Sequence, residues 1–238
     1  MFLHFLGRGA GFADEHTSAY FVTNNEDFFL IDCPCSAFVK LKHLDLCTCN
    51  KLYTLITHTH GDHIGGLGLW VQYCFFVLQK KVTILAPSEE VKKDIITILT
   101  IEGNEPDWYE TSVISHHIDS LNPYDEFPYI EPVLTEHSPQ LSGKCFGYYI
   151  EAIYGKAFVY TGDTSTLEPF KEFFDCCDEL YVDISVSYGQ IHLKLEDALP
   201  DLIRLTNQNI KVYLMHLDNE KRAQKLINGI PNIKVASV

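Results

Sequence analysis

Apolar and polar positions along the chain form short runs, and their spacing predicts strands and helices in alternation. In the first half, runs rich in aromatic and β-branched residues predict strands at 2–7, 18–23, 28–33, 51–58 and 81–87. Helices are predicted at 37–46, 65–78 and 88–103. The second of these is apolar nearly all round and is therefore expected to be buried. The third begins at Ser88, a favourable N-cap, and ends at Gly103.

The second half repeats this alternation. The elements expected there are a hairpin over 145–163 turning at 154–156, a short helix at 167–174, strands at 179–186, 211–217 and 234–238, and helices at 195–205 and 219–230. Pro200 is expected to kink the helix at 195–205 or to delay its start. The acidic, aromatic segment 104–132 shows no clear period and is expected to be a long, partly ordered loop.

Two series of strands with helices after them predict an α/β protein with a four-layer αβ/βα sandwich. No long Pro-, Gly- or Ser-rich linker and no internal repeat divides the chain, so we expect one domain over residues 1–238. The chain is long enough to bury a substantial core.

Composition and charge narrow the choice of partners. Hydrophobic residues make up 46% and charged residues 21%, as in ordinary soluble proteins, and no apolar run is long enough to cross a bilayer. We therefore expect a cytoplasmic protein without membrane association. The formal net charge of −14, from 18 basic and 32 acidic residues, disfavours an extended nucleic-acid-binding face, which needs a basic stripe.

Two small-residue patterns are weak signals. The eight cysteines include the pairs "CPC" and "CTC", but structural zinc sites more often use Cys-x-x-Cys, so we expect reduced thiols. Gly7, Gly9 and Gly11 give G-x-G-x-G instead of the dinucleotide-binding G-x-G-x-x-G, and no helix is predicted to begin there.

The segment "HTHGDH" after the strand at 51–58 concentrates metal-binding side chains. Alternate side chains at a strand end point to the same side, so His58 and His60 are expected to converge on one ion. The turn that follows directs Asp62 and His63 toward a second ion close by. Imidazole and carboxylate ligands suit Zn²⁺, and also Mn²⁺ or Fe.

With this H-x-H-x-D-H motif the chain resembles the metallo-β-lactamase superfamily, and further motifs follow in the order of that family: "TEHSP", "YTGDT" and "YLMHLD". The resemblance implies two divalent metal ions, zinc in the first place and manganese as an alternative. One ion would be held by His58, His60 and His137. The other would be held by Asp62, His63 and His216, with Asp163 bridging both. The remaining histidines outside these motifs are expected to be ordinary polar residues: His4, His16, His43, His116 and His117.

Neighbouring cations activate water and polarise the bond under attack, so the predicted chemistry is metal-assisted hydrolysis. The superfamily cleaves several kinds of bond. The full ligand set argues against a β-lactamase, and a glyoxalase II-like thioesterase is a weaker alternative. The N-terminal "FLGRGAGF" and the segment "QIHLKLEDALPDL" resemble the ribonuclease Z branch and its phosphodiesterase relatives. By that resemblance Asp62 and His192 are the catalytic residues, His192 donating a proton to the leaving group. The alternative is that His192 only caps the following helix.

The chain also departs from ribonuclease Z. The predicted hairpin leaves no room for the tRNA-gripping arm, and "VDISVS" replaces the acidic His-Glu-Ala-Thr segment. The arm-less relatives include cyclic-nucleotide phosphodiesterases of the anti-Pycsar type, which destroy cyclic nucleotide immune signals, and enzymes that cleave cyclic phosphate sugars. The resemblance therefore favours a small nucleotide substrate.

Several alternatives stay open. They are tRNA 3′ processing, a cyclic phosphate sugar substrate, and a module that sequesters a nucleotide without hydrolysing it. Aromatic residues of segment 104–132 are expected either to stack on a base or to pack in the core or at a dimer interface. The resemblance also implies a homodimer.

Overall fold

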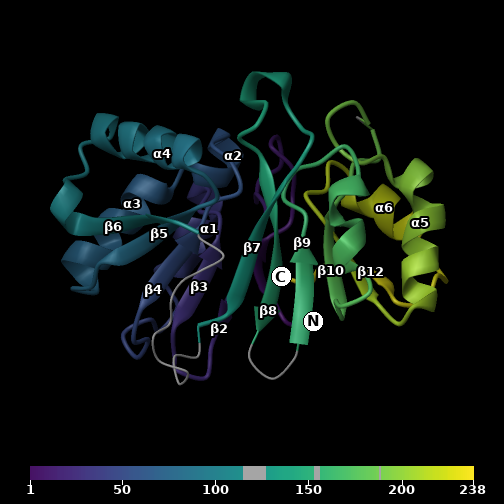
Figure 1. The fold of residues 1–238 in the computed structure, drawn as a ribbon, viewed down its shortest axis with the longest axis horizontal. Coiled ribbons are helices and arrows are strands. Elements are labelled where there is room, and N and C mark those ends of the chain that lie inside the picture. The colour runs from purple at the N-terminus through teal and green to yellow at the C-terminus, as the bar shows by residue number, and fades with distance from the viewer. Residues whose placement is uncertain (115–126, 153–155, 188) are drawn as a thin grey trace.

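Two six-stranded β-sheets lie face to face at the centre of the molecule, with helices on their outer sides (Figure 1). The computed structural model describes residues 1–114, 127–152, 156–187 and 189–238. The first sheet contains β1 (His4–Gly7), β2 (Ser18–Val22), β3 (Phe28–Ile31), β4 (Leu52–Leu55), β5 (Val82–Ala86) and β6 (Tyr109–Val113), in that order. The second contains β12 (Ile233–Val235), β11 (Lys211–Met215), β10 (Glu179–Asp183), β9 (Lys156–Tyr160), β8 (Phe146–Ala152) and β7 (Tyr129–Leu134).

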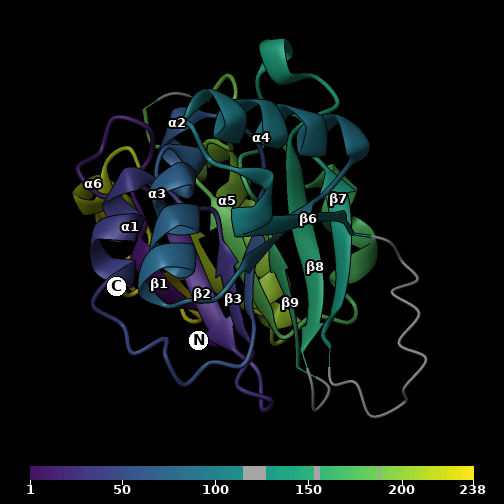
Figure 2. The ribbon, with the colours of Figure 1, turned by 90° about the vertical axis from the view of Figure 1, so that its left-hand side faces the viewer.

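The helices divide between the two outer faces. Those that follow strands of the first sheet are α1 (Cys35–Leu41), α2 (Gly61–Ile64), α3 (Leu67–Gln72) and α4 (Glu89–Ile101), and α3 continues into a π-helical turn, η1 (Tyr73–Val77). Those that follow strands of the second are α5 (Leu195–Asn207) and α6 (Glu220–Leu226). Short 3₁₀ turns are η2 (Pro106–Trp108), η3 (Pro139–Leu141) and η4 (Glu168–Phe173). Figure 2 shows α1, α3 and α4 across the outer face of the first sheet.

Alternation along the buried strands gives each sheet two hydrophobic faces. In β3, Phe28 and Leu30 pack in the cluster that includes α1, α3 and α4, whereas Phe29 and Ile31 pack between the sheets. In β10, Tyr181 likewise joins the layer between the sheets, while its neighbours in the strand pack in the cluster that includes α5. The predicted four-layer αβ/βα sandwich is therefore confirmed. That residues 1–238 form a single domain stays a prediction.

The structure corrects three expectations. Segment 104–132 contains two edge strands, β6 and β7, and is not simply a loop; residues 115–126 lie outside the described part. The helical segment 65–78 is not buried all round, because Leu69, Phe76 and Val77 are 50%, 59% and 61% exposed. Of the two effects expected of Pro200, the delayed start is wrong, because helix α5 begins at Leu195; the kink stays a prediction. The expected hairpin is present as antiparallel β8 and β9, but its turn at 153–155 is not described.

The parallel strands of each sheet bring their carboxyl ends to a common edge of the sandwich. β3 to β6 are parallel, as are β9 to β12. Two residues that directly follow such strands, Asp32 and His216, adopt left-handed backbone conformations with φ of 58° and 55°. Such conformations cost about 1–3 kcal/mol for non-glycine residues and concentrate at functional sites. Among the described helices, none has both the length and the apolar character needed to cross a bilayer.

Candidate metal centre

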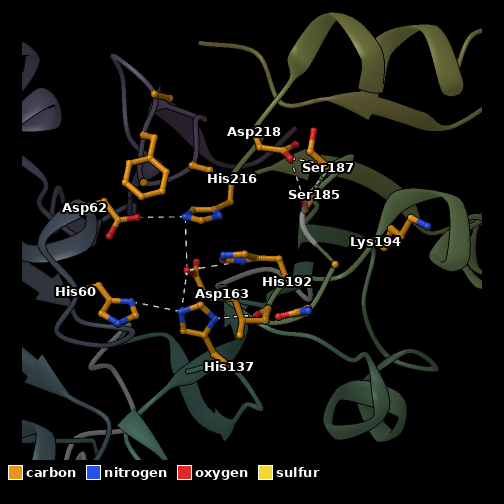
Figure 3. A pocket seen from close by; sticks show the side chains of 17 residues that line it. His60, Asp62, His137, Asp163, Ser185, Ser187, His192, Lys194, His216 and Asp218 are labelled. Atoms are coloured by element: carbon orange, nitrogen blue, oxygen red, sulfur yellow. Dashed lines mark hydrogen bonds and ion pairs between the residues drawn. The ribbon is translucent and has the colours of Figure 1, made fainter. Parts of the chain in front are cut away.

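The carboxyl-terminal ends of strands from both sheets position the predicted ligands. His58 and His60 follow β4, and Asp62 and His63 lie on the short helix α2. The other three come from the second sheet: His137 in the loop after β7, Asp163 after β9 and His216 after β11. All seven side chains come together. Five of them are labelled in Figure 3 and point toward a common centre, with His192 beside them: His60, Asp62, His137, Asp163 and His216.

One group of ligand atoms consists of three imidazoles and one carboxylate. His58 Nε2 lies 3.0 Å from His60 Nδ1, which in turn lies 3.3 Å from His137 Nε2. Asp163 Oδ2 lies 3.4 Å from His137 Nε2 and 3.8 Å from His58 Nε2. Each of these ring nitrogens offers a lone pair to a cation when its proton is on the other ring nitrogen, so the three imidazoles can serve one ion.

The second group shares Asp163 with the first. His63 Nε2 lies 3.2 Å from Asp163 Oδ1 and 3.5 Å from Asp62 Oδ2. His216 Nε2 lies 3.3 Å from Asp62 Oδ2 and 3.5 Å from Asp163 Oδ2. His63 Nε2 is buried and makes no hydrogen bond within the described chain. In each group the ligand atoms lie within 4.8 Å of one another.

Asp32 orients the second group and was not anticipated from the sequence. Its Oδ2 accepts a hydrogen bond from His63 Nδ1 at 2.8 Å and from the Thr57 hydroxyl at 2.7 Å, and its Oδ1 accepts from the Thr57 amide. A carboxylate behind an imidazole fixes its tautomer and raises the basicity of the outer nitrogen. The only local signal for Asp32 is a carboxylate at the end of the wholly apolar strand "FFLI".

Asp183, the last residue of β10, serves two histidines and was also missed. Its Oδ2 accepts from His192 Nδ1 and from the Thr164 amide, at 2.8 and 2.9 Å, and its Oδ1 lies 3.2 Å from His216 Nδ1. These contacts place the His192 ring 4.8 Å from the ring of His216, centroid to centroid. Asp163, Asp183, His192 and His216 thus form a further group with converging ligand atoms.

The position of His192 excludes the alternative in which it caps the next helix. The N-cap of α5 is Lys194, and no side chain makes a cap hydrogen bond there. His192 instead lines the pocket over the centre, with its side chain 16% exposed. Its role in catalysis stays a prediction.

The charges in the centre suit cation binding. Burial and the neighbouring His63 hold the pKa of His58 well below its usual value, so its imidazole is neutral and able to donate a lone pair to a cation. Burial raises the pKa of Asp163, but His216 and His63 outweigh this and keep it ionised. Burial lowers the pKa of His216, but Asp163 and Asp183 outweigh it and raise the value to about 10. The ionised carboxylates therefore stabilise positive charge in the centre, either as protons on the histidines or as divalent ions.

Two kinds of observation show that the residues fit metal ions. Three imidazole nitrogens of the first group face one another, and His63 Nε2 of the second is buried without a hydrogen bond. A set of imidazoles with a shared carboxylate is the donor chemistry of Zn²⁺ or Mn²⁺. The His58, His60, His137 and Asp163 group and the Asp62, His63, Asp163 and His216 group are therefore each able to hold an ion. That they do so stays a prediction.

A pocket of ≈ 1020 Å³ opens above the centre. Its lining includes His60, Asp62, His137, Asp163, His192 and His216 from the candidate centre. One wall carries Ser185 and Ser187, both bound to the Asp218 carboxylate (Figure 3). Among the described lining residues Lys194 is the single lysine or arginine, against three aspartates. An anionic ligand would therefore be repelled unless cations compensate the carboxylates.

Described aromatic residues of segment 104–132 lie outside this pocket. Trp108 stacks on Phe75, and Phe127 packs edge-on against Phe29. Tyr109 is buried, and Tyr129 binds Glu131 at the far end of β7. None of these four described residues lines the pocket over the candidate centre. Tyr124 lies outside the described residues.

The remaining cysteines and histidines are as expected where they are described. All eight cysteines are free thiols. His4 stacks on Tyr20, and His16 binds Ser36. His43 is exposed, and His116 and His117 lie in the segment that is not described.

Replacing Asp32 by asparagine is expected to weaken divalent-metal binding about 10- to 100-fold. The amide would present an N–H group to His63 Nδ1, which would then leave its outer nitrogen protonated. Competition with a chromophoric chelator measures the affinity. Asp45→Asn, an exposed carboxylate away from the centre, is the matched control. Unchanged affinity in a folded Asp32→Asn protein would exclude this orienting role.

Comparison with proteins of known structure agrees with the fold. The chain is similar to the metallo-β-lactamase fold protein YhfI from Bacillus subtilis, at 16% identity and a TM-score of 0.74, covering 99% of this chain and 95% of that one. It is also similar to Zn²⁺-bound PqqB from Methylobacterium extorquens (13%, TM-score 0.71, 99% and 97% covered). A third is human tRNase Z, short form (17%, TM-score 0.66, 99% and 96% covered). The metallo-β-lactamase fold implied by the sequence motifs is thereby confirmed.

Comparison of the sequence itself with protein families also gives a match. A family model described as anti-Pycsar protein Apyc1 matches residues 1–232. Curated protein sequences give no significant match.

Proposed function

The chain belongs to the anti-Pycsar protein Apyc1 family, and from this premise we propose that it is a metal-dependent phosphodiesterase that hydrolyses a small cyclic nucleotide. One observation carries the proposal. Seven predicted ligands from both halves of the sequence come together, and five of them line a pocket that His192 also lines. The pocket volume of ≈ 1020 Å³ is at the upper end for small-molecule sites and accommodates a nucleotide.

The donor groups support two divalent ions. His58, His60 and His137 would hold one, and Asp62, His63 and His216 the other, with Asp163 shared. Such ions supply the positive charge that polarises a phosphodiester and activates water for attack. The excess of carboxylates over lysine in the pocket supports this, because a phosphodiester anion would otherwise be repelled.

The chain's own residues supply orientation and a proton. Asp32 and Asp183 hold His63, His192 and His216 in fixed orientations from behind. Burial lowers the pKa of His192, but the Asp183 carboxylate outweighs it and the pKa is raised. A histidine with a raised pKa keeps a proton near neutral pH, and we assign to it protonation of the alkoxide leaving group.

Long RNA substrates fit less well. Strands β8 and β9 are joined by only residues 153–155, which leaves no space in the sequence for a tRNA-binding arm. The net charge of −14 also disfavours a long polyanion.

A hydrolysis panel with Zn²⁺- or Mn²⁺-loaded protein tests the proposal. It contains 3′,5′-cyclic purine and pyrimidine mononucleotides, cyclic dinucleotides, a base-free cyclic phosphate sugar, a pre-tRNA with a 3′ trailer and a thioester. We expect turnover of cyclic nucleotides and none with metal-free protein. Cleavage of only the sugar phosphate, the tRNA or the thioester would contradict the assigned substrate. A nucleotide that is bound and then recovered intact after denaturation would indicate sequestration instead.

A further inference from the structure

The loop after β1 places an unusual side chain at the pocket. Phe12 is 107% exposed, more than any other large hydrophobic residue in the described chain, and it lines the same pocket as the candidate metal centre. It is also the single Phe, Tyr or Trp among the described lining residues. A fully exposed phenyl ring contributes nothing to the core, and at a pocket its whole face is available to contact a ligand.

Backbone hydrogen bonds hold this loop firmly. The Ala13 amide donates to the Ala10 carbonyl and the Gly9 amide to the Glu15 carbonyl, each at 2.9 Å. The Ala10 amide donates to the carbonyl of Leu217, the residue after His216. The loop that carries Phe12 is thus tied to the strand end that carries a predicted metal ligand.

Glycines allow the loop to close beside the centre. A Cβ atom at Gly9 would lie 2.4 Å from Ala13 Cβ, so only glycine permits the closed loop. A Cβ atom at Gly11 would lie 3.1 Å from Asp62 Oδ2, which shows how near the loop backbone approaches that carboxylate. The "GRGAGF" sequence, which fails as a dinucleotide motif, therefore positions a phenyl ring next to the metal-binding residues.

We propose that Phe12 is a specificity-determining residue that stacks on the base of the nucleotide whose phosphate lies at the metal centre. This inference rests on the proposed function for the position of the phosphate. A phenyl face stacks on any base without reading its hydrogen-bonding edge. The metal centre makes the same contacts with the phosphate of a nucleotide and of a base-free phosphodiester. The phenyl ring contacts only the nucleotide, through its base, and so selects it.

Binding measurements separate this inference from the proposed reaction. The probes are a hydrolysis-resistant 3′,5′-cyclic phosphorothioate nucleotide and its base-free ribose counterpart, titrated by calorimetry into metal-loaded protein. Phe12→Ala is expected to weaken nucleotide binding about 10- to 100-fold and to leave the base-free ligand and the metal content unchanged. Phe12→Trp should bind the nucleotide like the wild type, whereas Phe12→Leu should resemble the alanine variant. Phe76→Ala, an exposed phenylalanine outside the pocket lining, is the matched control.

In the measurements on Phe12→Ala, three outcomes would overturn the inference. They are equal losses for both ligands, no loss for the nucleotide, or dissociation of an oligomer by Phe12→Ala, which would place the ring at an interface between two copies. Nucleotide binding that depends on Phe12 without any hydrolysis would support the inference while contradicting the proposed activity. Hydrolysis of nucleotide and base-free substrate with equal kcat/KM would support the proposed activity and contradict the inference about Phe12.

Discussion

Chains carrying Asp163→Ala are expected to lose at least one of two bound divalent ions and to hydrolyse phosphodiesters about 10³-fold more slowly or worse. Asp163 is buried, and its two oxygens approach His63, His137 and His216 at 3.2 to 3.5 Å. No other carboxylate belongs to both candidate ligand groups. Elemental analysis gives the metal content, and initial rates on a cyclic mononucleotide give the activity.

The control for Asp163→Ala is Asp201→Ala on the exposed face of α5, where the side chain is 63% exposed and pairs only with Arg204 in the described chain. That variant should keep both ions and full activity. Circular dichroism shows whether each variant is folded. An Asp163→Ala protein with full metal content and unchanged turnover would contradict the bridging assignment.

His192→Ala is expected to keep both ions but to lower kcat about 10²- to 10⁴-fold on substrates with an alkoxide leaving group. Its ring is fixed by the 2.8 Å contact between Nδ1 and Asp183 Oδ2 and lies in the pocket over the centre. A p-nitrophenyl phosphodiester, whose leaving group needs no proton, should be affected far less.

This contrast between leaving groups identifies a proton donor, because a structural or metal-binding role would slow both substrates alike. His43→Ala, an exposed histidine away from the pocket, is the control. Equal losses on both substrates, or a loss of metal, would make His192 a metal ligand instead of a proton donor. Its ligand atom lies close enough to those of Asp163, Asp183 and His216 for that role.

Strong local periodicity made most strands and helices predictable. The buried strands of both sheets have continuous apolar runs, and α4 begins at its Ser88 cap, whose side chain accepts from the Val91 amide. The edge strands β6 and β7 were missed, because β6 reads "YETSV" with alternating exposure and β7 contains Pro132. An edge strand faces solvent and tolerates proline, so its hydrophobic signal is weak.

Helical exposure was misjudged for a related reason. Segment 65–78 is apolar on all sides, yet Phe76 and Val77 are largely exposed where the α-helix passes into a π-helical turn. A pattern without a polar face cannot indicate which side meets the sheet.

By itself the sequence determined the two series of strands, the clustered motif from His58 to His63 and the order of the later ligands, because these depend on local spacing and on motifs of a few residues. Only the tertiary structure decided the rest. Asp32 reaches His63 from 31 positions away, and Asp183 at the end of another strand lies behind both His192 and His216. Such partners carry no local pattern, since a lone carboxylate at a strand end is identified only when the sheets bring it behind a histidine. The same holds for Phe12, whose exposure and place in the pocket follow from a loop closed by glycines against another strand's end.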